Sequence, residues 1–240
     1  MPMYEWTADM VRFMRDASEQ NGYHAALAAR IAAHLPKNAH VCDAGCGLGY
    51  LSLALAPYAR RVTAVDIAPH ALCVLEENIG RKGLANIRAI CGDIAACPPE
   101  KPYDAMIFCF FSSVKEALRL AKAQCGGPVI FVKRDWAGHR VSPQAADIRH
   151  TVAQAETELA AYNIPFRTER FTLCMDQPLR SLEDAAAFFR AYGKGAPELA
   201  QQELKARLIM RENGEFPYYY PMENRLGMLV LNAGELPAYQ

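Results

Sequence analysis

The chain has 240 residues, and its 26 basic residues balance its 26 acidic residues. This length suits one α/β domain with a full core. The lack of net basic charge argues against a nucleic-acid partner, because such proteins need cations along the phosphate backbone. No apolar run reaches the ~18 residues that span a bilayer, and charges interrupt the first residues where a signal peptide has its apolar core. The eight cysteines form no C-x-x-C pair. We therefore expect a cytoplasmic protein with reduced thiols and no membrane partner.

Helices and strands are predicted to alternate along the first two thirds of the chain. Two N-terminal helices are expected over 8–16 and 22–35, within a helical cap formed by residues 1–36. Apolar runs predict five strands, over 39–42, 62–65, 87–90, 103–111 and 129–132. Helices are expected between them, at 50–56, 69–83 and 113–124. Alternation at this pitch is typical of βαβ units and a parallel sheet.

The last third of the chain is predicted to interrupt this pattern. A helix over 143–162 and a strand over 166–175 are expected first, and the last strand over 226–231. The excursion between these strands contains predicted helices near 182–192 and 197–211, the first starting at Ser181. With no repeat or linker, we interpret residues 1–240 as one domain. Its predicted parts are a core at 39–175, a cap insertion at 176–222 and the last strand at 225–232.

Glycines and carboxylates follow the first three predicted strands. Residues 43–49 read DAGCGLG, directly after the first strand. Glycine allows the backbone to turn sharply and a ligand to lie against it, and the next helix begins there with free N–H groups. Asp66 ends the second strand, where a carboxylate can accept both hydroxyls of a ribose, and Asp93 follows the third. In a parallel sheet, these three strand ends meet at one edge, which predicts a nucleoside site.

Three segments carry a resemblance to a known family. VCDAGCGLGYLSLALA, VTAVDIAPHAL and IRAICGDI resemble, in order and spacing, the nucleoside-binding motifs of class I S-adenosylmethionine-dependent methyltransferases, over about residues 39–135. The resemblance implies a Rossmann-like α/β fold whose seven-stranded, mostly parallel sheet has helices on both faces and an antiparallel last strand. The N-terminal helices and a helical insertion before the last strand would be additions to that fold.

The resemblance also implies S-adenosylmethionine as cofactor and assigns residues to it. Gly45, Gly47 and Gly49 would face its methionine part, Asp66 would hold the ribose and Ile67 would pack on the adenine. Asp93 and the N–H of Ile94 would bind the adenine edge. The expected cofactor-binding set is completed by Asp43, Cys46 and Phe108.

Methyl transfer from a sulfonium is a direct displacement, in which good alignment can supply ~7–11 kcal/mol. The family therefore often needs no universal catalytic residue, and none is evident in this sequence. His24 and His139 are candidates for a general base, because imidazole titrates near neutral pH. No histidine pair has metal-ligand spacing, so no metal site is predicted.

The predicted fourth and fifth strands offer candidates for substrate binding. Residues 108–112 read FCFFS and lack the Asn/Asp-Pro-Pro-aromatic motif of relatives that act on amino groups of bases or glutamine. This apolar wall favours a small, partly hydrophobic substrate. Lys133 and Arg134 end the fifth strand, where one of them could hold an anionic group. The alternative is that they pair with Asp135 or face water. Tyr219 belongs to an aromatic cluster that could contact substrate or only pack.

Several alternatives remain open at this point. A nicotinamide-dependent oxidoreductase would carry G-x-G-x-x-G, whereas this chain has G-x-G-x-G and an additional acidic motif at Asp93. A non-catalytic cofactor-binding protein, or a methyltransferase acting on protein or RNA, is a further alternative to an enzyme acting on a small molecule. The methylated atom and the oligomeric state are not predicted by the sequence.

Overall fold

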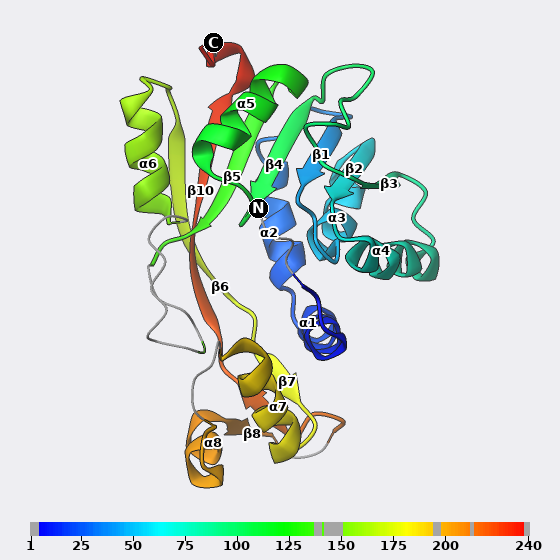
Figure 1. Ribbon diagram of the computed structural model, residues 1–240, viewed down its shortest axis with the longest axis vertical. Coiled ribbons are helices and arrows are strands. Elements are labelled where there is room, and N and C mark those ends of the chain that lie inside the picture. The colour runs from blue at the N-terminus through cyan, green and yellow to red at the C-terminus, as the bar shows by residue number, and fades with distance from the viewer. Residues whose placement is uncertain (1–4, 137–140, 142–150, 194–197, 212–213, 238–240) are drawn as a thin grey trace.

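A seven-stranded sheet forms the centre of the structure. The computed structural model describes residues 5–136, 141, 151–193, 198–211 and 214–237. The sheet contains β1 (His40–Ala44), β2 (Arg61–Asp66), β3 (Ile87–Cys91), β4 (Ala105–Cys109), β5 (Pro128–Arg134), β6 (Arg167–Cys174) and β10 (Glu223–Asn232). Their order is β3-β2-β1-β4-β5-β10-β6, with β10 antiparallel to both its neighbours (Figure 1). This confirms the predicted mostly parallel sheet with an antiparallel last strand.

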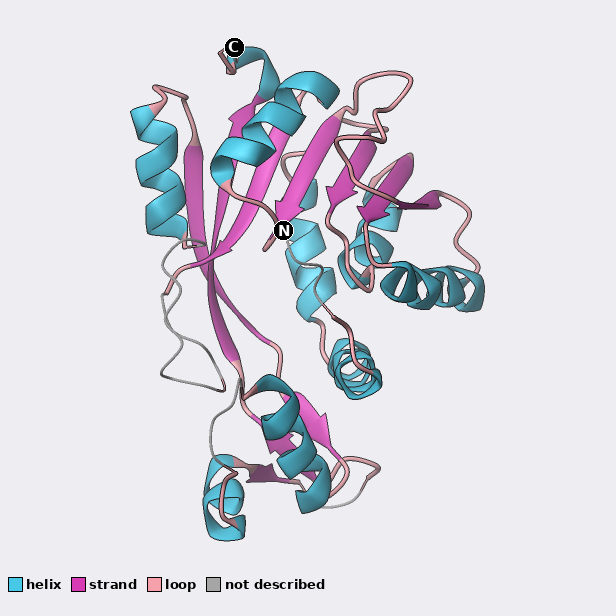
Figure 2. Ribbon diagram, in the orientation of Figure 1, coloured by secondary structure: helices cyan, strands magenta, loops and turns pink. Residues whose placement is uncertain are grey.

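Helices cover both faces of this sheet (Figure 2). They are α2 (Tyr23–Ala32), α3 (Tyr50–Leu55), α4 (Pro69–Lys82), α5 (Val114–Gln124) and α6 (Val152–Ala161), with short 3-10 turns at Ala56–Tyr58 and Ala233–Glu235. Helices α5 and α6 pack on one face against Phe131 and Leu229. Helices α2 and α3 pack on the other face against Val132 and Leu226. No helix in the described part of the chain is long and apolar enough to cross a membrane.

The chain between β6 and β10 forms a small α/β unit, which we call the insertion. It contains β7 (Gln177–Leu179), α7 (Leu182–Tyr192), α8 (Gln201–Arg207), β8 (Ile209–Met210) and β9 (Tyr218–Tyr220). The two helices agree with the sequence, although α8 is shorter than the predicted 197–211. The three-stranded sheet β7-β9-β8 was not predicted. The insertion therefore contains both expected helices and, in addition, this small sheet. Part of the predicted helix 143–162 lies outside the described residues.

The insertion lies beyond the carboxyl ends of the parallel strands, at the opposite end of the molecule from the C-terminus (Figure 1). Strands β6 and β10 lead towards it. The N-terminal helix α1 (Ala8–Gln20) packs against it, because Phe13 belongs to the same hydrophobic cluster as Leu179 and Phe188. The Phe13 and Phe188 rings meet edge to face at 5.3 Å.

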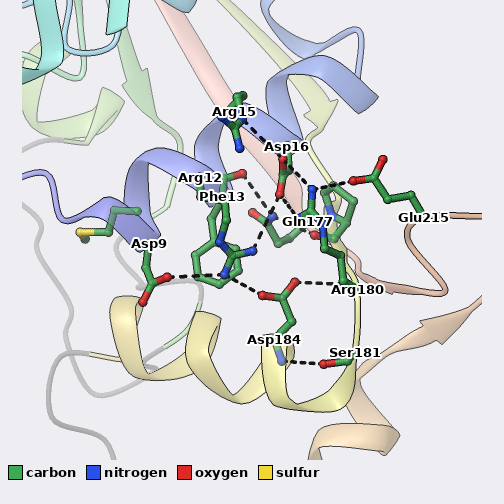
Figure 3. A network of polar contacts seen from close by, with 12 residues as sticks. Asp9, Arg12, Phe13, Arg15, Asp16, Gln177, Arg180, Ser181, Asp184 and Glu215 are labelled. Atoms are coloured by element: carbon green, nitrogen blue, oxygen red, sulfur yellow. Dashed lines mark hydrogen bonds and ion pairs between the residues drawn. The ribbon is translucent and has the colours of Figure 1, made fainter. Parts of the chain in front are cut away.

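A polar network joins α1 to the insertion (Figure 3). Asp16 of α1 is only 4% exposed and accepts hydrogen bonds from the Arg180 guanidinium. Arg180 also donates to Glu215 at 2.8 Å. Arg12 pairs with Asp184 of α7 at 2.7 Å. Buried apolar contacts and paired charges therefore fix α1 to the insertion rather than leaving it as an independent helix.

Candidate active site

The glycine-rich turn has the backbone conformation that its sequence predicts. Gly45, Gly47 and Gly49 have φ values of +69°, +53° and +74°, a region that side-chain-bearing residues rarely adopt. The N–H groups of Gly45 and Cys46 both donate to the Val65 carbonyl, at 2.8 and 3.1 Å, which ties the turn to β2. A Cβ atom at Gly49 would lie 2.4 Å from Leu75 of α4, so packing excludes a side chain there as well.

Asp43 lies beneath this turn in a fully enclosed position. It is 1% exposed, and the Ser52 hydroxyl donates to its Oδ2 at 2.5 Å. Burial raises the pKa of Asp43 to about 6; the hydrogen bond from Ser52 opposes this shift, and the nearby Asp66 carboxylate reinforces it. Asp43 can therefore contribute a negative charge to the site near neutral pH, but it does not face solvent directly.

Asp66 and Asp93 lie at the same edge of the sheet as Asp43. The Asp66 carboxylate accepts the N–H groups of Gly47, at 2.7 Å, and Ala68, at 2.9 Å. The Gly92 N–H donates to the Asp66 carbonyl at 2.9 Å, which places the ends of β2 and β3 side by side. Asp93 is exposed, and its Oδ1 accepts from the Ala95 N–H at 2.9 Å.

Two isoleucines follow these carboxylates and differ in exposure. Ile67 is 46% exposed and can offer an apolar surface to a ligand. Ile94 is 5% exposed, and its carbonyl accepts from Gln124 at 2.8 Å. The structure thus brings Asp43, the glycine turn, Asp66, Ile67 and Asp93 to one edge, in the arrangement expected for a nucleoside site.

The loop after β4 closes over the glycine turn. Phe110 and Ser112 have positive φ values of +55° and +60°, which are uncommon for residues with side chains. Between them, the Phe111 ring lies directly over Gly45, where a Cβ atom would be 2.2 Å from it. Phe108 is 0% exposed and stacks between Phe111 and Phe131. Phe108 therefore lies in the core, and Phe111 is the aromatic residue of this loop that borders the turn.

Lys133 and Arg134 point to opposite faces of the sheet, as expected for neighbours on a strand. Lys133 is 1% exposed, and its ammonium donates to the carbonyls of Ser112, at 2.8 Å, and Phe111, at 3.3 Å. Burial lowers the pKa of Lys133 to about 8. The Lys133 ammonium, predicted to hold substrate, is therefore already bonded to two carbonyls of the β4 loop in this structure. Arg134 is partly exposed at the end of β5.

The other predicted residues lie apart from the carboxylates. The His24 ring lies 5.0 Å from Tyr23 and 5.6 Å from Tyr50, measured between ring centres. Burial lowers the pKa of His24 to about 4, so the imidazole is neutral and only weakly basic at physiological pH. Tyr219 lies in the small sheet of the insertion with the Arg211 guanidinium stacked on it at 4.0 Å. His139 lies outside the described residues.

The sequence did not single out two aromatic contacts with the glycine turn. Besides Phe111, Trp6 approaches Gly47, since a Cβ atom there would lie 3.3 Å from its ring. The sequence shows the aromatic residues after β4 and Trp6 near its start, but it does not indicate which glycine each of them contacts. Within the described residues, no three His, Cys, Asp or Glu side chains gather in a way that could hold a metal ion.

Comparisons with known proteins agree with this geometry. Residues 41–125 match the family described as "Methyltransferase domain". The chain is 36% identical over 77 residues to a protein-L-isoaspartate O-methyltransferase of Methanoculleus marisnigri, a segment that spans 31% of this chain and 35% of that relative. The chain therefore matches about a third of the length of that relative.

Solved structures share the fold at low sequence identity. The YcgJ protein of Bacillus subtilis has a TM-score of 0.57 and 16% identity, over 88% of this chain and 99% of that one. Magnesium protoporphyrin IX methyltransferase of Synechocystis, solved with bound SAH, has a TM-score of 0.50 and 16% identity, over 94% and 88% of the two chains. Residues 41–125 therefore match a methyltransferase domain, and the solved structures show that the chain shares their fold.

Proposed function

We propose that the protein transfers a methyl group from S-adenosylmethionine, by direct displacement, to a small molecule that carries an anionic group. The observation that carries this proposal is the gathering of the glycine turn, Asp43, Asp66 and Asp93 at the edge of the sheet beyond which the insertion lies. The Arg134 guanidinium, at the end of β5, is the cation that we assign to the substrate anion. The eight free cysteines of the protein suit the reducing cytoplasm.

The residues of the chain would act by binding and alignment. Asp66 would accept the ribose hydroxyls, Ile67 would cover the adenine, and Asp93 with the Ile94 N–H would bind the adenine edge. The glycine turn would admit the methionine part of the cofactor against the backbone, which requires the Phe111 ring to move away from Gly45. The site would exclude water and hold the methyl acceptor in line with the sulfonium. His24, which is weakly basic, is a poor candidate for a proton acceptor.

Methyltransferases acting on protein or RNA are the main alternative. One curated relative is an uncharacterised RNA methyltransferase of Halalkalibacterium halodurans, 37% identical over 67 residues, and the match spans 15% of that relative. Net charge favours a small molecule here, because the basic and acidic residues balance at 26 each.

The proposal is tested by cofactor binding and by a matched substrate screen. In calorimetry, S-adenosylmethionine and S-adenosylhomocysteine should bind, whereas NAD should not. Small acids should be methylated in preference to their neutral amides or esters. Arg134→Met should remove this preference and leave cofactor affinity intact, at a cost of about 1.5–3 kcal/mol in the specificity constant. Arg167→Met, on the exposed start of β6, is the matched control. Binding of NAD alone would refute the cofactor assignment, and equal turnover of acids and amides would refute the anionic substrate.

Asp66→Ala should weaken binding of S-adenosylhomocysteine about ten- to a hundredfold. The substitution removes a charged acceptor for two ribose hydroxyls, which corresponds to about 1.5–3 kcal/mol. It also frees the Gly47 N–H, which the carboxylate accepts at 2.7 Å, so thermal unfolding should be measured alongside calorimetry. Glu76→Ala, at an exposed position of α4, should bind the ligand as the unmodified chain does. Unchanged affinity of a folded Asp66→Ala protein would contradict the ribose role.

The insertion and α1 should become protected when the site is filled. Lids that close over a site exclude water and complete it. Helix α1 contacts the insertion, and Trp6, two residues before α1, contacts the turn. We expect amide hydrogen exchange in 8–20 and 177–192 to slow when S-adenosylhomocysteine and a substrate acid are present together. Exchange in α5, on the far side of the sheet, serves as the internal reference. Protection confined to the glycine turn would argue against a lid.

A further inference from the structure

Asn224 is an enclosed amide without hydrogen bonds. It lies on β10, is 0% exposed, and neither its Oδ1 nor its Nδ2 has a partner among the described residues. An amide can accept two hydrogen bonds and donate two, and buried polar groups are nearly always paired. Two other buried amides each have a paired NH2 group, although the Gln124 Oε1 also lacks a partner among the described residues. Gln177 donates to the carbonyls of Phe13 and Pro178, and Gln124 donates to that of Ile94.

The register of the sheet places Asn224 beside Arg134. Arg134 ends β5 directly opposite Leu226 of β10, and Asn224 is two residues before Leu226. Opposite residues, and residues two apart on one strand, point to the same face. Arg134 and Asn224 are therefore diagonal neighbours on one face. A hydrogen bond from the Asp135 N–H to the Arg225 carbonyl, at 2.9 Å, keeps the two strands together beyond the end of β5. Asn224 thus lies past the carboxyl end of β5, near the start of β10, where the chain returns from the insertion.

The surroundings of Asn224 on this face are largely apolar. Its cross-strand neighbour is Leu173 of β6, which packs with Leu226 and Met175 in the hydrophobic cluster under α2. The fold therefore places an unsatisfied amide diagonally across from Arg134, and gives neither its donor nor its acceptor a partner in the described part of the chain.

We propose that Asn224 and Arg134 form the polar end of the substrate subsite, and that this subsite takes a carboxylic acid with a hydroxyl or amine beside the carboxylate. The guanidinium and the Asn224 Nδ2 donate to the carboxylate oxygens. The Asn224 Oδ1 accepts from the neighbouring hydroxyl or amine. A ligand of this kind satisfies both halves of the amide, whereas a plain carboxylate leaves Oδ1 without a donor. This inference rests on the proposed function, because it names the substrate class of that same site.

The test measures ligand binding to the full chain saturated with S-adenosylhomocysteine. The probes are a panel of aliphatic and aromatic hydroxy acids, including salicylate, with salicylamide and benzoate as partners that lack the carboxylate or the hydroxyl. We expect the best hydroxy acid to bind about tenfold more tightly than either of its partners. Asn224→Leu should abolish the preference over the plain acid, and Arg134→Met the preference over the amide. Arg225→Met, exposed on the other face of β10, should change neither.

Thermal unfolding separates this role from a structural one. Asn224→Leu replaces an unsatisfied amide with an apolar side chain of similar size and should keep or raise the melting temperature. If that variant does not fold, Asn224→Asp provides the same readout, because its charge should repel carboxylates and lower their affinity at least tenfold. A folded Asn224 variant that keeps the hydroxy-acid preference would overturn the inference, as would a panel without any preference. Failure of S-adenosylhomocysteine to bind the unmodified chain would instead refute the proposed function.

Discussion

Asp43→Asn should stabilise the folded protein near neutral pH by an amount on the order of 3 kcal/mol. Burial raises the pKa of Asp43 from 3.8 to about 6, and each pKa unit corresponds to about 1.4 kcal/mol. The folded protein therefore holds a proton between about pH 4 and pH 6 that the unfolded chain has lost. The contribution of Asp43 to stability falls as the pH rises through this window and stays low above it. Asparagine does not titrate, so the variant should escape this loss.

The measurement is the difference in unfolding free energy between the two proteins as a function of pH. It should be near zero below about pH 4, grow through the window and level off above about pH 6. Ser52→Ala removes a hydrogen bond that lowers the Asp43 pKa, so it should move the upper limit of the window to higher pH. A difference that does not change with pH would contradict an ionised, buried Asp43.

The same substitution should weaken cofactor binding selectively. S-adenosylmethionine carries a sulfonium charge that S-adenosylhomocysteine lacks, and the turn above Asp43 is where the methionine part is proposed to lie. Asp43→Asn should therefore reduce affinity for the charged cofactor more than for its product. A carboxylate that destabilises the fold but attracts the cofactor is an example of stability given up for function.

The strands of the large sheet could be predicted from the sequence because local residue patterns determine them. Unbroken apolar runs are typical of strands covered on both faces, and each of the five predicted runs in the first part of the chain overlaps a strand of the large sheet. The backbone has positive φ values at residues 45, 47 and 49, and this conformation favours glycine at these positions. The Ser181 signal was also reliable, because its hydroxyl accepts the Asp184 N–H at 3.1 Å, as a helix cap does.

Other features depend on contacts that no local pattern specifies. Strands of two or three residues, such as β8 and β9, exist because distant segments pair with them. Strand alternation predicted that Lys133 and Arg134 point to opposite faces of the sheet. It did not predict that the Lys133 ammonium would donate a hydrogen bond to the Ser112 carbonyl. The positive φ values of Phe110 and Ser112 likewise belong to a loop held by tertiary contacts rather than by its own sequence. No sequence pattern pointed to Asn224, because what distinguishes it is the lack of a hydrogen-bond partner among the described residues.

Arg180→Met should destabilise the protein by about 2–4 kcal/mol. The Asp16 carboxylate is 5% exposed and accepts two hydrogen bonds from Arg180, so the substitution leaves a buried charge with weaker partners. Those partners are Arg15 and Arg12, at 3.8 and 3.9 Å. Chemical denaturation should report the loss, and hydrogen exchange should rise in α1 and β7 together, since Gln177 also donates to the Phe13 carbonyl.

A double-mutant cycle separates this pair from general damage to the fold. Asp16→Asn alone removes the charge that needs Arg180, so the double variant should be more stable than the sum of the two single losses predicts, by at least about 1 kcal/mol. Arg190→Met, on α7, breaks an exposed pair with Glu198 and should cost less than about 0.5 kcal/mol. Cofactor affinity should fall in Arg180→Met, because only Thr7 separates α1 from Trp6, which lies against Gly47. Additive losses would mean that Asp16 and Arg180 contribute separately, and unchanged cofactor affinity would mean that α1 does not transmit the state of the insertion to the glycine turn.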